Sequence, residues 1–173
     1  MRAQTDTYNV YRFEELSEEA QAAALDNCRE WQTDGEWWDC TYEDAERIGL
    51  KITSFDLDRN RGAEGNFTCS AHEVAQNVMT EHGPECETYK TAVAFMEEWQ
   101  PIFNNYMDES HRDYESRDAE DKLQDLEDEF LRSLLEDYST MLQDECDYLQ
   151  SDEAVQEMIE AGGYEFTEAG ELV

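Results

Sequence analysis

Most of the side chains able to do chemistry in this 173-residue chain are carboxylates. Asp and Glu number 45, against 12 Lys and Arg and three His. Carboxylates bind divalent cations and serve as general acids or bases. At this density some pairs fall within two-metal distance by chance, so such pairs are no indication of a nuclease. Indications of function must therefore come from specific residue spacings and from the net charge of −33.

One segment begins like a calcium-binding loop. Residues Asp56–Gly62 read D-x-D-x-N-x-G, but an EF-hand requires Gly at its sixth position and Glu at its twelfth. Arg61 and Phe67 occupy those positions, and Arg59 adds a second positive charge where a cation would bind. We therefore predict a polar hairpin turn without calcium. The two arginines could alternatively form salt bridges with a neighbouring acidic face.

Two Cys/His pairs have zinc-like spacing. They are Cys69-x2-His72 and His82-x3-Cys86. The first His should open a helix and the second should close it, which separates them by roughly 15 Å. One tetrahedral site cannot collect both without breaking that helix, so we expect no zinc and no other cofactor.

The sequence holds no phosphate loop, HExxH motif or nucleophile-elbow glycine pattern. Catalysis by His with Cys or Ser stays open, but we do not expect an enzyme. Nucleic acid and anionic membranes would repel a chain of net charge −33, so the expected partners are basic protein surfaces. This charge exceeds the magnitude of about 2–8 that solubility requires in a small domain. Adaptation to high salt is a second explanation, and the scarcity of lysine agrees with it.

The composition predicts a folded protein that stays in the cytoplasm. Apolar residues make up 39% and aromatic residues 12%, enough for a core. We find no apolar stretch of about 18 residues and no secretory h-region. Five cysteines without a CxxC pair favour reduced thiols in a cytosol.

Hydrophobic periodicity predicts an α+β fold in a single domain, residues 1–173. A small antiparallel sheet should lie in residues 1–83, a predominantly helical acidic part in 84–163, and a final strand and tail in 164–173. The last strand should pair with the hairpin or with the first strand. The predicted strands cover residues 7–13, 50–57, 63–69 and 164–167. The predicted helices cover residues 17–31, 37–48, 70–81, 85–107 with Pro101 as a kink or a new start, 117–150, and 151–163.

The helix over 117–150 should have an apolar stripe and an acidic face. Leu123, Phe130, Leu134 and Met141 point one way on a helical wheel. Its acids are spaced about 4 Å apart along the axis, comparable to the spacing of about 3.4 Å between phosphates on one DNA strand. We predict that the opposite face binds a partner through Asp118, Asp121, Asp125, Asp128, Glu129, Glu136 and Asp147.

The tryptophans divide into predicted core residues and one predicted anchor. Trp31, Trp37 and Trp99 should be buried, whereas Trp38 could be an exposed anchor in the partner interface.

Two resemblances point in the same direction. The segment YRFEELSEEAQAAAL, Tyr11 to Leu25, resembles the opening of small uncharacterised proteins of phages and prophages, and WWDCTYEDAERIGLKITSFDLDRNRG is similar to the same group. In charge and size, the chain resembles phage-encoded DNA mimics, the antirestriction and anti-CRISPR inhibitors. These resemblances imply an inhibitor that occupies the basic nucleic-acid-binding groove of a restriction nuclease or CRISPR effector. The alternatives are a mobile-element enzyme or accessory factor with incidental acidity, and an antitoxin-like binder of a basic protein.

Overall fold

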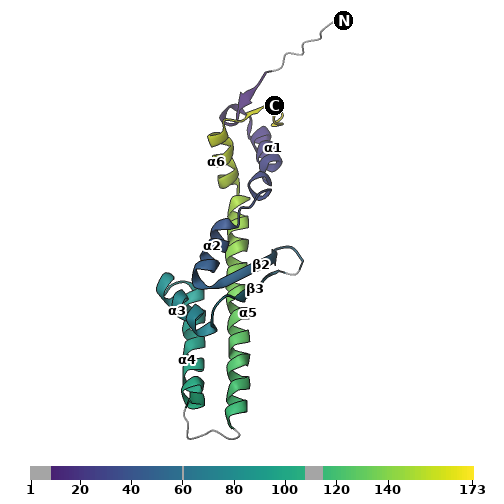
Figure 1. Cartoon of the computed structure of the whole chain (residues 1–173). Helices are drawn as coiled ribbons and strands as arrows, with labels where there is room; N and C mark the ends of the chain where they lie inside the picture. Colours follow the sequence, from purple (N-terminus) through teal and green to yellow (C-terminus); the bar gives the residue numbers. More distant parts are fainter. Residues whose placement is uncertain (1–8, 60, 108–114) are drawn as a thin grey trace. The chain divides into compact units, whose positions relative to one another are not determined.

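The computed structural model describes residues 9–59, 61–107 and 115–173, and it confirms a mixed α+β fold. The described chain forms six α-helices, two 3₁₀ turns and two short two-stranded antiparallel sheets (Figure 1). Contacts group the chain into two units: residues 1–37 with 144–173, and residues 38–143. This grouping differs from the division at residue 83 that composition suggests, because residues from both ends of the chain pack in the first unit.

The first unit is built from the two ends of the chain. β1 (Tyr11–Arg12) pairs antiparallel with β4 (Glu165–Phe166), which decides between the two pairings expected for the last strand. The other elements of this unit are η1 (Phe13–Glu15), α1 (Glu18–Cys28), η2 (Trp31–Thr33) and α6 (Asp152–Gly162). Its core lies between α1 and α6, with contributions from η1 and β4, and comprises Phe13, Leu16, Ala20, Ala24, Cys28, Val155, Ile159 and Phe166.

Local sequence explains where three helices begin. The hydroxyls of Ser17, Ser70 and Ser151 each accept a hydrogen bond from the backbone N–H three residues on, as expected of N-cap residues. Acidic residues follow in each first turn, where the helix dipole favours them. All three caps agree with the predicted starts.

Arg29 fastens the end of α1 to the start of α6. Its guanidinium donates to Asp152 Oδ1 at 2.8 Å, to Asp26 Oδ1 at 2.9 Å and to the Gln150 carbonyl at 2.6 Å. Gln32 adds side-chain hydrogen bonds to two further backbone carbonyls, those of Leu149 and Ala154. These polar contacts complement a small apolar core.

The second unit contains a β-hairpin and four helical segments. α2 (Asp39–Ile48) leads into β2 (Leu50–Asp56) and β3 (Gly62–Phe67), then α3 (Ala71–Glu81) and α4 (Glu87–Met107). α5 (Glu115–Leu149) follows and contributes its residues up to 143 to this unit. Pro101 lies inside α4, so no new helix begins there.

Two glycines allow the hairpin to sit against its neighbours. Gly49 ends α2 at φ 91°, a left-handed conformation that favours glycine. A Cβ at Gly65 would collide with the Lys51 carbonyl on the neighbouring strand and would press tightly on the Leu135 side chain of α5. The hairpin therefore packs directly on α5, as Figure 1 shows.

A β-bulge breaks the alternation expected for residues 50–57. The register shifts between Ile52 and Ser54, and Thr53 is the extra residue. Leu50 and Ile52 are buried in the core, whereas beyond the bulge it is Phe55 that packs against other rings.

The core of the second unit follows one stripe of α5. Leu123, Phe130, Leu134, Tyr138 and Leu142 are buried, and the Phe130 ring stacks on Phe95 of α4 with centroids 4.3 Å apart. Steps of four residues advance the stripe around the helix by about 40° each.

Met141 does not belong to this stripe. It is 40% exposed, contrary to prediction, and Leu142 is buried instead. Phe130 faces α4, whereas the Tyr138 hydroxyl contacts Asp44 of α2, so the buried side of α5 changes along the helix.

Other predicted boundaries need smaller corrections. The first strand covers only Tyr11–Arg12, because Phe13 begins a 3₁₀ turn, and residues 7 and 8 lie outside the described part. α1 ends at Cys28 rather than at residue 31.

The high charge predicts that added salt stabilises the fold. Self-repulsion among exposed carboxylates is screened with a Debye length of about 10 Å at 0.1 M salt. We expect the melting temperature to rise between a few millimolar and about 0.1 M sodium chloride, measured by circular dichroism at pH 7. A melting temperature that falls over this range would contradict a surface dominated by repulsion.

Candidate partner-binding surface

The acids proposed to bind a partner all lie on solvent-exposed positions of α5. Those in the second unit are Asp118, Asp121, Asp125, Asp128, Glu129 and Glu136, and Asp147 belongs to the first unit. The six acids of the second unit recur mostly at intervals of three or four residues, which keeps them on the side away from the buried stripe. Arg132 is exposed between Glu129 and Glu136 and interrupts the row with one positive charge.

Few of these carboxylates are neutralised within the described structure. Lys122 pairs with Asp118 at 2.5 Å, and this hydrogen bond raises the pKa of Lys122. Gln124 donates to Asp128 at 2.9 Å. The carboxylates of Asp121, Asp125, Glu129 and Glu136 have no hydrogen bond or ion pair with a described group, so their charge is available to a partner.

Among the described acids, those that are not fully exposed are Asp44, Glu127, Asp137 and Glu145. The donors to Asp44, Glu127 and Asp137 lie on other elements. Trp99 Nε1 donates to Glu127 at 3.3 Å, the Thr91 hydroxyl donates to Asp137 at 2.7 Å, and Asp44 is the centre of a larger network. In these three cases the carboxylate is partly buried, and a hydrogen-bond donor replaces part of its hydration.

The Asp44 network joins α2 to α5 and to the segment between α3 and α4. Asp44 Oδ2 accepts a hydrogen bond from Tyr138 at 2.8 Å, and Asp44 Oδ1 lies 2.6 Å from Arg47 Nη2. Burial and the neighbouring Asp44 carboxylate raise the pKa of Tyr138 far above its ordinary value. His82 is buried with Nδ1 2.7 Å from the Thr88 hydroxyl. Its Nε2 is 3.3 Å from Asp44 Oδ2 but is not aligned for a hydrogen bond with any described group.

The tryptophans are distributed differently from the prediction. Trp99 is buried as expected, but Trp31 is 38% exposed and Trp37 is half-buried. Trp31 lies beyond the end of α1 and is not on its buried face. Its ring packs edge-on against Tyr164, with ring centroids 5.3 Å apart. Trp38 is half-buried against Phe55 at 5.4 Å, so its proposed role as an anchor would use only the remaining exposed part of the ring.

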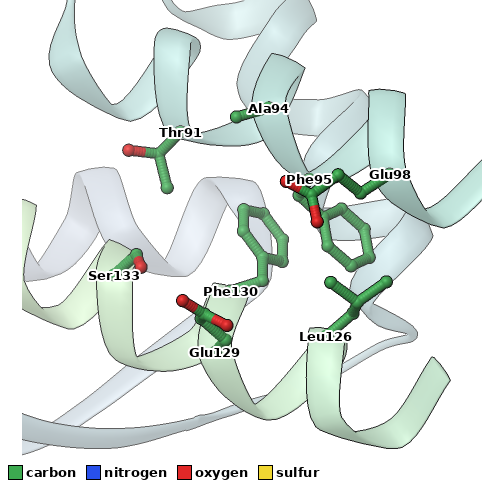
Figure 2. Close-up of a pocket in the computed structure, with 8 residues that line it drawn as sticks. All are labelled: Thr91, Ala94, Phe95, Glu98, Leu126, Glu129, Phe130 and Ser133. Atoms are coloured by element: carbon green, nitrogen blue, oxygen red, sulfur yellow. The ribbon is translucent and has the colours of Figure 1, made fainter. Parts of the chain in front are cut away.

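A cleft of about 240 Å³ lies between α4 and α5 (Figure 2). Each helix supplies four residues with the same spacing of three, four and seven: Thr91, Ala94, Phe95 and Glu98 from α4, and Leu126, Glu129, Phe130 and Ser133 from α5. The stacked Phe95 and Phe130 rings form its apolar part, and the carboxylates of Glu98 and Glu129 come from opposite helices. The cleft is not predicted from the sequence, although the repeated spacing of its lining residues on both helices would have indicated it.

The metal-like motifs do not assemble in the described residues. No three His, Cys, Asp or Glu side chains there are placed to hold a metal ion. Asp56 accepts hydrogen bonds from the backbone N–H groups of Asp58 and Arg59, as in an ordinary polar turn, and Asn60 lies outside the described residues. His72 packs on the Trp99 ring at 4.8 Å, which leaves it in a different environment from His82.

The cysteines of the described structure are all free thiols. Burial raises the pKa of Cys28 and, together with the charge of Glu73, that of Cys69. Both shifts reduce the thiolate fraction and make nucleophilic chemistry at these two positions less favourable.

Comparisons with known proteins provide no relative. No family model, curated protein or solved structure matches this chain. In the described residues, no helix is both long and apolar enough to cross a membrane.

Removal of the Tyr138 hydroxyl should destabilise the second unit. In Tyr138→Phe, Asp44 loses a donor in a partly buried site, and we expect a loss of about 1–2 kcal/mol in the free energy of unfolding. Tyr148→Phe, on the same helix but 55% exposed, is the matched control and should change little. Urea denaturation measures both, and equal midpoints for the two variants would show that the network does not stabilise the fold.

Asp137→Asn should stabilise the protein at pH 7. Burial, and to a smaller extent the charges of Glu87 and Glu136, raise the pKa of Asp137, although the Thr91 hydrogen bond opposes them. A raised carboxyl pKa means that the folded state favours the protonated form, so stability from this group is present at low pH and is lost as pH rises through the folded pKa.

The amide should remove this loss while it still accepts the Thr91 hydrogen bond. Melting temperatures of the variant and the wild type should converge as pH falls towards 4. Asp125→Asn removes the same charge from an exposed position and corrects for general repulsion. If both variants raise the melting temperature equally at pH 7, burial of Asp137 is not the cause.

Proposed function

We propose that this protein is a phage-encoded inhibitor of a host defence nuclease, an anti-CRISPR or antirestriction protein that acts as an acidic nucleic-acid mimic. The observation that carries the proposal is the row of exposed acids on α5, four of which have no described polar partner. The resemblance of Tyr11–Leu25 to phage and prophage proteins supports the phage origin, and the net charge of −33 supports the choice of a basic partner.

The mechanism is competition for a basic groove. Lys and Arg side chains that normally hold phosphates would pair with the carboxylates of α5, and the groove would be closed to DNA or guide RNA. Acids three or four residues apart are separated by about 4.5–6 Å along a helix, of the same order as the phosphate spacing of a nucleic-acid strand. Long-range attraction would accelerate association at low salt.

The helix supplies rigidity that a disordered acidic tail lacks. The buried stripe of α5 packs against α4 and the hairpin, which fixes the direction of the exposed face, so the carboxylates are ordered before the partner arrives. Pre-ordering reduces the entropy lost on binding. Since carboxylates copy phosphate geometry imperfectly, apolar contacts beside the acids should add affinity. The target would be a restriction nuclease or CRISPR effector in the host cytoplasm, and the protein itself would be no enzyme.

The proposal is tested by capture and charge reversal. Immobilised protein should retain a basic nucleic-acid-binding protein from bacterial lysate, and added DNA should release it. Asp125→Asn alone should change retention little, because exposed ion pairs contribute about 0–1 kcal/mol each. Combined substitution by Lys at Asp121, Asp125, Asp128, Glu129 and Glu136 should abolish retention.

Circular dichroism must show that the reversed variant keeps its helices, since all five positions are exposed and face away from the core. A folded variant that still captures the same protein would exclude the α5 surface. Capture that DNA does not affect would favour an antitoxin-like complex over mimicry.

A further inference from the structure

We propose that the cleft between α4 and α5 receives an arginine side chain of the basic partner. This inference rests on the proposed function, because it assigns one specific contact within the same interface. Acids alone would not define such a site. The cleft adds a built cavity with an aromatic part, and its volume of about 240 Å³ is many times the roughly 10–15 Å³ that one water requires.

The charge of the cleft selects a cation. Its two charged lining residues, Glu98 and Glu129, are both exposed, and neither has a hydrogen bond or ion pair with a described side chain. Asp137 is bound by Thr91 at one end of the cleft and adds a third negative charge nearby. None of the described residues that line the cavity is basic.

The arrangement of apolar and polar groups favours guanidinium over ammonium. Guanidinium is planar, has weakly hydrated faces that pack on aromatic rings, and directs its N–H donors outwards in its own plane. Here the Phe95 and Phe130 rings stack on each other and are only 6% and 3% exposed, so they give the cleft a narrow apolar wall rather than open ring faces. A carboxylate is supplied by each helix (Figure 2). Ammonium is a compact and strongly hydrated charge that gains less from such an apolar surface.

A second groove in the same unit provides an internal contrast. It lies between the hairpin and α5, and Arg61 and Arg132 line it together with Glu136. Two positive charges make that groove a poor site for an arginine. The partner's arginine should therefore select the α4–α5 cleft, although both grooves adjoin the acidic face of α5.

The site can be tested without the partner. Isotope-labelled full-length protein is titrated with N-acetyl-arginine amide at fixed ionic strength and followed by NMR. Saturable shifts should concentrate in residues 91–98 and 126–133. The neutral citrulline analogue should not bind, and N-acetyl-lysine amide should bind several-fold more weakly.

Three variants separate this site from general attraction to a protein of net charge −33. Glu98→Gln with Glu129→Gln should weaken the arginine-amide affinity about fivefold or more. Glu43→Gln with Glu46→Gln removes the same charge from exposed positions of α2, outside the cleft and outside the α5 row, and should change the affinity less than about twofold. Ala94→Leu fills the cleft at an exposed position without a change of charge and should abolish the localised shifts.

Shifts spread evenly over the acidic surface, or equal weakening by both double variants, would overturn the proposal. Equal affinity for the lysine and arginine amides would overturn the assignment to guanidinium. The proposed function can fail separately. If the charge-reversed α5 variant still captures the partner while Ala94→Leu abolishes amide binding, the cleft is an arginine-binding site but the protein does not act as a nucleic-acid mimic. If Ala94→Leu leaves the amide shifts unchanged while charge reversal abolishes capture, the mimic stands without the cleft.

Discussion

Repulsion among carboxylates is the constraint that the rest of this structure must satisfy. A fold with a net charge of −33 is stable only if nearly every acid remains in water. Each helix can therefore bury only a narrow stripe of apolar side chains. α5 meets this requirement in the second unit, where one side holds Leu123, Phe130, Leu134 and Tyr138 in the core and the other exposes acids. The same division produces the candidate surface, because the face that cannot be buried is free to bind.

The few acids withdrawn from water follow the same rule. Asp44 and Asp137 each accept a hydrogen bond from a hydroxyl on another helix, so they tie α2 and α4 to α5. Glu98 and Glu129 differ, since they border a cavity yet have no described polar partner. Asp44 and Asp137, which have donors, connect helices of the fold. Glu98 and Glu129 are therefore the carboxylates that we propose to bind a cation of another protein.

Local signals explain which parts of the fold were predictable. The serine caps, Gly49 and the apolar periodicity of α5 depend on a few neighbouring residues, so the sequence indicated the helix starts and the long helix. The burial of Leu142 in place of Met141 was not predictable from periodicity, because the neighbours of α5 change along the helix: Phe130 stacks on α4, whereas Tyr138 contacts Asp44 of α2. The β-bulge at Thr53 and the exposure of Trp31 also arise from packing. The acidic face was predictable from spacing, but the cleft required knowledge that α4 and α5 pack together.

We propose that this protein and nucleic acid compete for one basic surface of the target. The most direct test measures the apparent dissociation constant between the target and its own DNA or guide RNA at increasing concentrations of the protein. Fluorescence anisotropy of labelled nucleic acid with the purified target provides it. Competition predicts that the apparent constant rises in proportion to the protein concentration without reaching a limit. A rise that levels off, with a complex containing all three components, would contradict mimicry and require an allosteric mode of inhibition.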